Sequence, residues 1–241
     1  MKFSNIYALV LLCFSGSVFG SPIFDGKTLD GWEGERGLWN IENGVITAEI
    51  KEGRSLNKNA FLFYKETVGD FELSLEYKIT GATTANSGIQ IRSKNKNGQA
   101  IGYQCDLDDG KTWLGRVYDE HGRALIAERG ELTIIDEAGK PTKLPFQKSP
   151  SDLAKFVKKD DWNRYRIIAK GHRIEIHING VHFTTLEDYQ RGEFDKEGLI
   201  ALQLHSGKGA AKVQFKNISL KKFSSTNSQL GATTQRKTET G

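Results

Sequence analysis

The stretch Phe71–Ile79, FELSLEYKI, alternates apolar and polar side chains at every step. In an extended chain, its Phe, Leu, Tyr and Ile residues fall on one face, and its Glu, Ser and Lys residues fall on the other. A period of two sustained over such a run predicts a β-strand with one buried face. This segment therefore sets the fold class that the rest of the chain has to match.

Further segments carry the same strand pattern and are separated by turn residues. Asn179-Gly180 lies between two apolar alternations and predicts a tight hairpin, and Gly171-His172 predicts another. The other predicted strands are Gly88–Arg92, Arg164–Lys170, Arg173–Ile178, Val181–Leu186, Gly198–His205 and Lys212–Phe223. Together they form a meander of short antiparallel strands. We therefore expect an all-β, two-sheet antiparallel sandwich of jelly-roll type.

Only one segment has a convincing helical pattern. In Ser151–Lys159, Ser151 is suited to cap a helix, Asp152 suits its first turn, and Leu153, Phe156 and Val157 share one face. The preceding segment, His121–Pro150, is rich in Gly, Pro and charge, and we expect a long excursion that carries a small hairpin or lid. The predicted fold thus has one short helix in a long loop.

The composition restricts the protein to a few classes. The chain has 241 residues, 37% of them hydrophobic, with 34 Lys and Arg against 30 Asp and Glu and a net charge of +4. This balance excludes a disordered chain and favours one globular domain. The charges are spread along the chain with no block of like charge, so we expect no nucleic-acid partner.

The first residues predict export. Lys2, the apolar run IYALVLLCF at residues 6–14 and the small residues that end at Gly20 have the order of a secretory signal peptide. Leu12 precedes Cys13 where a lipoprotein needs a small residue, so we expect no lipid anchor. No other stretch is long enough to cross a membrane. The predicted organisation is a signal peptide at 1–20, a domain at 21–223 and a disordered tail at 224–241, with the protein periplasmic or secreted.

Removal of the signal peptide leaves Cys105 as the only cysteine, so no internal disulfide is possible. Cys105 lies between Gln104 and Asp106 in an extended run. We expect a buried small hydrophobe there rather than a nucleophile, because acidic neighbours raise the pKa of a thiol.

Several predicted strands place polar groups where a fully buried sheet has none. Gln90 shares a face with Arg92, Gln104 with Asp106, and Gln203 with His205; Glu76 lies on a polar face of its own strand. Two interpretations are open. These faces line a groove that binds a polyol and moves protons on it, or they are the solvated side of an antiparallel sheet.

Individual residues have alternatives of the same kind. His205 is suited to proton transfer near neutral pH, or it is a surface residue at a strand end. Arg92 binds an oxyanion, or it pairs with Glu76. Trp113, Tyr118 and Trp39 have rings that can stack on a sugar. The cluster Asp106, Asp108 and Asp109 holds a cation or makes a turn, and His177 is expected to be a solvated sheet residue.

These motifs resemble the 3-keto-disaccharide hydrolase domain family. The resemblance covers Pro22–Phe223 in order, and its most specific pieces are FDGKTLDGW at residues 24–32 and GLIALQLHSG at residues 198–207. Other matching pieces are NSGIQIR at 86–92, GYQ at 102–104 with Asp106, GRVY at 115–118, DWN at 161–163, Asn179-Gly180 and FKNI at 215–218. The resemblance implies a concanavalin A-like jelly roll in an exported carbohydrate-active protein.

The resemblance also implies a reaction: cleavage of the glycosidic bond of a glycoside already oxidised at C3. Such a substrate reacts by abstraction of the C2 proton, elimination at C1 and hydration. On this basis His205 acts as base or acid, with Asp106 or Glu76 as its complement. Substrate oxygens or pocket shape are assigned to Arg92, Gln203, Gln90, Gln104, Tyr118 and Trp113.

Where many members carry an acidic residue, this chain has Gln104, and Asp106 places a carboxylate two positions along the same face. The resemblance implies no organic cofactor, but it leaves room for a divalent cation at the C3 oxygen with ligands that the sequence does not identify. Two competing classes are a non-catalytic carbohydrate-binding module and a structural domain of a larger assembly. The oligomeric state does not follow from the sequence.

Overall fold

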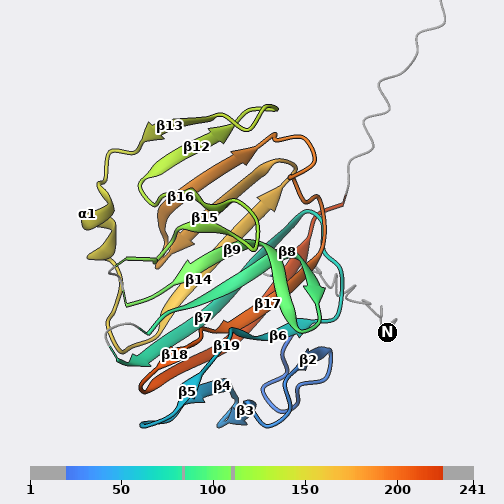
Figure 1. Cartoon of the computed structure of the whole chain (residues 1–241), viewed down its shortest axis with the longest axis vertical. Helices are drawn as coiled ribbons and strands as arrows, with labels where there is room; N and C mark the ends of the chain where they lie inside the picture. The colour runs from blue at the N-terminus through green and yellow to red at the C-terminus, as the bar shows by residue number, and fades with distance from the viewer. Residues whose placement is uncertain (1–19, 83–84, 110–111, 225–241) are drawn as a thin grey trace, which may run out of the picture.

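The computed structural model describes residues 20–82, 85–109 and 112–224, which form two large β-sheets packed face to face (Figure 1). This is the predicted two-sheet jelly-roll sandwich. Apart from Gly20 and Ser224, the predicted signal peptide and tail lie outside the described residues.

The larger sheet has ten strands, and β1 (Ser21–Pro22) joins it by pairing with β19. The order of the other nine is β13 (Pro141–Pro145), β12 (Glu131–Ile135), β16 (Val181–Asp188), β15 (Arg173–Ile178), β14 (Asn163–Lys170), β7 (Phe71–Gly81), β19 (Ala211–Lys222), β4 (Val45–Ile50) and β3 (Trp39–Glu42). Neighbouring strands in this sheet pair antiparallel, except β12 and β16, which pair parallel.

The second sheet has seven strands and carries the pocket described below. Its order is β11 (Ala124–Ala127), β10 (Val117–Glu120), β9 (Gln99–Leu107), β8 (Ser87–Lys96), β17 (Leu199–Leu204), β6 (Ala60–Tyr64) and β2 (Trp32–Gly34). A separate two-stranded ribbon pairs β18 (Gly207–Lys208) with β5 (Ser55–Leu56).

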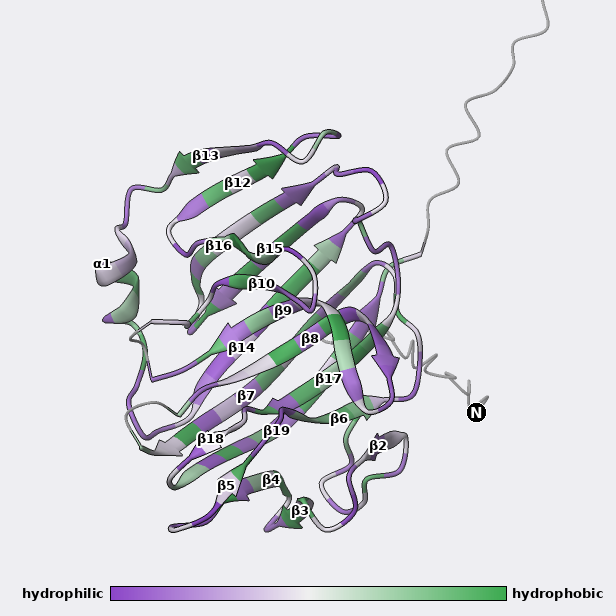
Figure 2. Cartoon of the chain, in the orientation of Figure 1, coloured by the Kyte–Doolittle hydropathy of each residue, from purple (hydrophilic) through white to green (hydrophobic). Residues whose placement is uncertain are grey.

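The core lies between the two large sheets, and the alternation in the sequence produces it. In β7 the apolar residues are buried and the polar residues between them are half-buried. β15 alternates in the same way, with Ile174, Ile176 and Ile178 inside. Figure 2 shows the resulting green and purple banding along β7, β15 and β19. Cys105 is fully buried in this core, and burial raises the pKa of its thiol, as expected of a structural cysteine.

The predicted hairpins are present. Asn179 and Gly180 both have positive φ angles, 49° and 80°, which are the angles of a type I′ turn between β15 and β16. The meander β14–β15–β16 follows from this turn and the one at Gly171. Crossovers elsewhere, such as β17 between β8 and β6, make the whole a jelly roll rather than a simple meander.

The long excursion and its helix differ in detail from the prediction. Helix α1 spans Pro150–Ala154, shorter than expected, and Ser149 rather than Ser151 caps it. Pro150 fixes this start because proline favours the first helical position. β12 and β13 form the expected hairpin, but it extends the edge of the ten-stranded sheet rather than covering the groove. Among the described residues, no helix is long and apolar enough to span a membrane.

Candidate functional site

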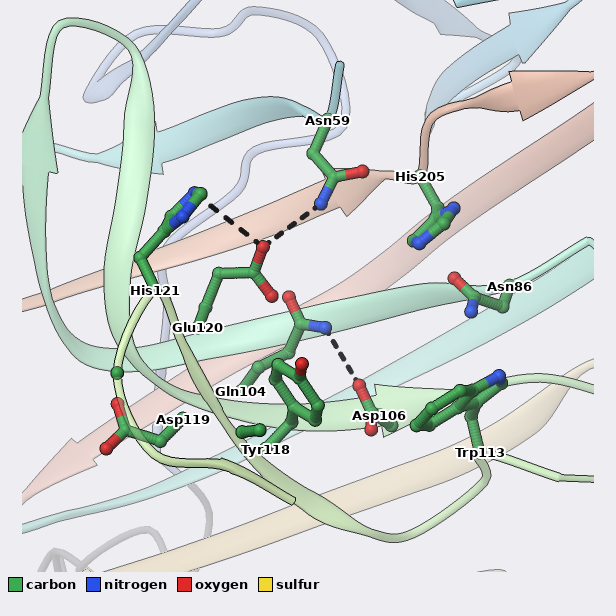
Figure 3. A pocket seen from close by; sticks show the side chains of 12 residues that line it. Asn59, Asn86, Gln104, Asp106, Trp113, Tyr118, Asp119, Glu120, His121 and His205 are labelled. Atoms are coloured by element: carbon green, nitrogen blue, oxygen red, sulfur yellow. Dashed lines mark hydrogen bonds and ion pairs between the residues drawn. The ribbon is translucent and has the colours of Figure 1, made fainter. Parts of the chain in front are cut away.

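A pocket of about 400 Å³ lies on the outer face of the seven-stranded sheet (Figure 3). Its lining is polar and aromatic. The residues that line it are Asn59, Asn86, Gln104, Asp106, Trp113, Tyr118, Asp119, Glu120, His121, Gly122, Ala124 and His205. The groove interpretation of the polar strand faces therefore holds for this sheet.

Strand parity brings the central residues together. On β9, Tyr103 and Cys105 point into the core, so Gln104 and Asp106 point outward into the pocket. On the neighbouring strand β10, Tyr118 pairs with Gln104, and Glu120 lies two residues further on. His205 follows the end of β17 and reaches the pocket from the other side of β8.

A network of amide side chains fixes Gln104. Its Oε1 atom accepts hydrogen bonds from the Nε2 atoms of Gln90 and Gln203, both at 2.8 Å, while Ser93 holds the Oε1 atom of Gln90 at 2.6 Å. With Oε1 occupied in this way, Nε2 of Gln104 donates to Oδ1 of Asp106 at 2.8 Å. Gln90 and Gln203 are fully buried and do not line the pocket. They therefore position Gln104. This differs from the prediction, in which Gln203 held substrate oxygens and Gln90 shaped the pocket directly.

Gly88 makes room for this arrangement. A Cβ atom at Gly88 would lie 2.4 Å from Cδ of Gln104, so the glutamine side chain occupies the space that any other residue would fill. Gly88 pairs with Asp106 across β8 and β9. The NSG segment of the sequence thus has a direct structural reason for its glycine.

Asp106 is a buried carboxyl group with one free oxygen. The residue is only 4% exposed, and its Oδ2 atom is buried with no hydrogen-bond partner among the described residues. Burial raises the pKa of Asp106 well above its usual range; the hydrogen bond from Gln104 opposes this shift, and the charges of Glu120 and Asp108 add to it. Because Oδ1 accepts from Gln104, the neutral carboxyl group carries its proton on Oδ2.

His205 is oriented by the main chain. Its Nδ1 atom lies 2.6 Å from the carbonyl oxygen of Ser206. A carbonyl only accepts, so Nδ1 carries the proton, and Nε2 of the neutral ring holds the lone pair. Asn59 supports this segment, because its Oδ1 atom accepts the backbone N–H of Ser206 at 2.8 Å. The result is an imidazole at the pocket wall whose Nε2 atom has no hydrogen-bond partner among the described residues.

Two aromatic rings form another wall of the pocket. Trp113 and Tyr118 meet edge to face at 6.2 Å, and the guanidinium of Arg116 lies 5.3 Å from the Trp113 ring. Asp108 accepts the backbone N–H groups of Thr112 and Trp113, so it makes the turn that presents the tryptophan. Trp113 remains 36% exposed, which leaves ring surface for a ligand.

Sequence reasoning missed several lining residues. Glu120 accepts from Nδ2 of Asn59 at 3.2 Å and lies 3.8 Å from Nε2 of His121. Asn86 contributes an Oδ1 atom that is buried without a partner among the described residues. Parity alone could have found Glu120, since it shares a face with Tyr118. Asn59, Asn86 and His121 lie outside regular strands, where no periodicity predicts their direction.

Arg92 does not reach the pocket, contrary to prediction. Its φ angle is +48° and the β8–β9 register shifts between Gln90 and Lys94, so parity fails at this position. The fully buried guanidinium donates to the carbonyls of Gly69 and Gly171 and to Oδ1 of Asp70, at 2.7–2.9 Å. Arg92 therefore ties loops together, and its acidic partner is Asp70 rather than Glu76.

Glu76 and Trp39 also lie elsewhere. Glu76 is on the outer face of β7 in the ten-stranded sheet, where Asn217 donates to it at 2.9 Å and Lys216 lies 3.5 Å away. Trp39 is buried in β3 of the same sheet. Neither residue lines the pocket, because both belong to the ten-stranded sheet and the pocket lies on the outer face of the seven-stranded sheet.

The pocket does not present a preassembled cation cage. Among the described residues, three His, Cys, Asp or Glu ligand atoms come close together only at Glu175, His177 and His182, on the other sheet. The carboxylates and imidazoles that line the pocket form no such group; they belong to Asp106, Asp119, Glu120, His121 and His205. We therefore assign no cation ligands there and derive no chemical step from a cation.

The fold and site define a concanavalin A-type sandwich with a polar, aromatic pocket on one sheet, a class suited to carbohydrate ligands. A family model described as the 3-keto-alpha-glucoside-1,2-lyase-like domain matches residues 21–221. The chain belongs to this family, as its motifs had indicated. Membership makes it a carbohydrate-active protein.

Solved structures share the fold at low sequence identity. A proposed glycosyl hydrolase from Parabacteroides distasonis is 19% identical, with a TM-score of 0.53, over 82% of this chain and 96% of that chain. The carbohydrate-binding module CBM66 from Bacillus subtilis is 16% identical, with a TM-score of 0.50, over 79% of this chain and 95% of that chain. No curated protein matched the chain.

Proposed function

We propose that this protein is an exported enzyme that cleaves the glycosidic bond of 3-keto-glycosides by abstraction of the C2 proton, elimination and hydration. The observation that carries the proposal is the pairing, in one pocket, of a buried carboxyl group with a free oxygen and an imidazole with a free nitrogen. The name of the family model supports the substrate class.

The chemistry follows from the ketone. A carbonyl at C3 acidifies the hydrogen on C2, so a base removes that proton and an enolate forms. The enolate expels the C1 substituent, which leaves with a proton, and a C1=C2 double bond remains. Water then adds across this bond and gives the free 3-keto sugar. This route needs one base and one acid, not the spaced carboxylate pair of ordinary glycosidases.

His205 takes the role of base in this proposal. Its Nδ1–H is held by the Ser206 carbonyl, so Nε2 is available to accept the C2 proton. The hydrogen bond of 2.6 Å from Nδ1–H to the Ser206 carbonyl stabilises the positive charge that develops on the ring. The positive ring exchanges its proton with solvent and supplies a proton to C2 when water adds, and the group that protonated the leaving group takes its proton back from that water.

Asp106 takes the role of acid. Its raised pKa keeps the carboxyl group protonated at higher pH than an exposed aspartic acid, and the proton lies on the unpartnered Oδ2 atom. Gln104 holds the other oxygen, so Oδ2 is the atom left to carry the proton for the leaving group. Trp113 and Tyr118 stack on the sugar, and Asn86 and Glu120 bind its hydroxyl groups.

A non-catalytic carbohydrate-binding module is the competing function. The half-exposed Trp113 beside Tyr118 favours it, because such a pair also serves simple sugar binding. The two functions differ in whether a bound 3-keto-glycoside is consumed.

The test incubates the purified protein with a 3-keto-glucoside and, separately, with the unoxidised glucoside. We expect release of the C1 substituent from the keto substrate alone. Binding without product from either compound would support the module instead. Export is tested by the compartment in which the expressed chain accumulates; a chain confined to the cytoplasm would refute it.

A further inference from the structure

A second group of side chains lies on the opposite face of the sandwich from the pocket. Glu175 and His177 of β15 and His182 of β16 bring their ligand atoms within 4.8 Å of one another. Ile174, Ile176 and Ile178 point into the core, so Glu175 and His177 point away from it on the outer face of the ten-stranded sheet. Neither the fold nor the proposed reaction requires two histidines and a carboxylate at this place.

An irregularity in β16 creates the group. Ile176 pairs with Thr184, but His177 pairs with His182, so Phe183 is an extra residue in the strand. Phe183 and Thr184 are both buried, and His182 returns to the outer face opposite His177. The two imidazole rings then stack at 4.8 Å with an interplanar angle of 20°. A bulge of this kind changes the direction of a side chain, and here it turns His182 toward the outer face.

The two ligand atoms on β15 already have the separation of metal ligands. Arg173 holds Oε1 of Glu175 at 2.7 Å, and Oε2 lies 3.3 Å from Nε2 of His177. In a tetrahedral site with bonds of about 2.0–2.1 Å, neighbouring ligand atoms are about 3.3 Å apart. A metal ion can therefore lie between these two atoms, bound by Oε2 of Glu175 and by the Nε2 lone pair of a neutral His177 ring that carries its proton on Nδ1.

His182 has the supporting contacts of a metal-bound histidine. Its Nε2 atom lies 3.2 Å from the carbonyl oxygen of Thr184 and 2.8 Å from Oγ1 of Thr185. Donation of Nε2–H to the carbonyl leaves the lone pair on Nδ1, and metal-bound histidines have this kind of contact through their other nitrogen. The Phe146 ring packs on the imidazole at 4.7 Å. His182 is therefore held between Phe146 and His177.

We propose that Glu175, His177 and His182 form a binding site for a transition-metal dication, with zinc as the reference ion and water in the fourth position. Two imidazoles and one carboxylate suit zinc, whereas calcium and magnesium prefer oxygen ligands throughout. Bound metal links β15 to β16 from outside the core and stabilises the folded chain in proportion to its occupancy. The site is independent of the pocket on the other sheet.

The experiment uses the full chain without an affinity tag, stripped with a chelator and dialysed against zinc chloride. We expect one zinc ion per chain and a raised melting temperature. His177→Gln and His182→Gln should each weaken binding at least about tenfold and remove the melting shift. Matched controls are His121→Gln, which changes a histidine beside a carboxylate in the pocket, and Asp106→Asn; both should bind zinc as the parent does.

Cobalt provides a second measurement that does not depend on stability. Cobalt bound by two imidazoles and a carboxylate in tetrahedral geometry gives visible absorption bands, and these should disappear in Glu175→Gln while circular dichroism shows the fold intact. Zinc binding that persists in the His177→Gln, His182→Gln double variant would overturn the proposal. Absence of saturable zinc binding by the parent chain at millimolar zinc would also overturn it.

Discussion

Replacing Asp106 with Asn tests two consequences of burying this carboxyl group. The first is proton donation to the leaving group, and the second is a change in how the stability of the fold depends on pH. The substitution keeps the shape of the side chain, and an amide oxygen can still accept the hydrogen bond from Gln104 that is 2.8 Å long in the parent. It removes the transferable proton on Oδ2. If Asp106 protonates the leaving group, kcat/KM for a 3-keto-glycoside should fall about 10²–10⁴-fold.

The same substitution should change how stability depends on pH. The pKa of Asp106 is raised in the folded state, so above the unfolded value of about 3.9 the folded chain binds more protons than the unfolded chain. The free energy of unfolding therefore falls with rising pH, at most by about 1.4 kcal/mol per pH unit, until the folded pKa is passed. Asp106→Asn lacks this loss, so its stability relative to the parent should increase with pH across that window.

Urea unfolding measured between about pH 4.5 and about pH 8 gives this difference, and turnover is measured on the same samples. Glu76→Gln is the matched control, because this carboxylate lies on the other sheet and contacts Asn217. It should retain near-parental turnover. A stability difference that does not change with pH would refute the assignment of a raised pKa, and turnover of Asp106→Asn close to that of the parent would refute its role as acid.

Other substitutions test the remaining parts of the site. His205→Ala should lower kcat about 10²-fold or more; near-full activity would remove this histidine from the mechanism. Gly88→Ala places a Cβ 2.4 Å from the Gln104 side chain and should lower kcat, whereas Gly69→Ala meets nothing closer than 3.7 Å and should not; equal kcat values for the two variants would contradict the packing argument. Arg92→Met should lower the free energy of unfolding by about 2–4 kcal/mol and leave KM unchanged. A raised KM with parental stability would instead indicate that Arg92 binds the substrate. The resemblance leaves room for a divalent cation at the C3 oxygen; if one acts there, chelation should abolish activity and added divalent metal should restore it, and activity that survives chelation would exclude it.

Strand periodicity carried the prediction of the fold, although several central strand pairs contain a register shift. β15 was predicted with its observed bounds, and β7 differs only at its last residues, since both alternate without interruption. The same parity placed Gln104 and Asp106 on one outward face. Their meeting with His205 also depended on strand order, which the sequence does not determine.

The errors arose where alternation breaks or where a contact is not local. Arg92 follows Gln90 by two residues, yet its positive φ angle turns it to the other side of the sheet. Glu76 lies on a polar face as regular as that of β9, and only the assignment of β7 to the other sheet removes it from the pocket. Asn59 and Asn86 enter from loops, where side-chain direction depends on the completed fold.

If the glycosidic bond breaks by elimination, the C2 proton must be removed first, and a deuterium label at C2 reports this removal. The substrate is a 3-keto-glucoside labelled with deuterium at C2, and its products are followed by mass spectrometry in ordinary water. We expect each molecule that loses its C1 substituent also to lose its C2 deuterium, and His205→Ala to slow both losses together. Release of the C1 substituent with the C2 deuterium fully retained would contradict it.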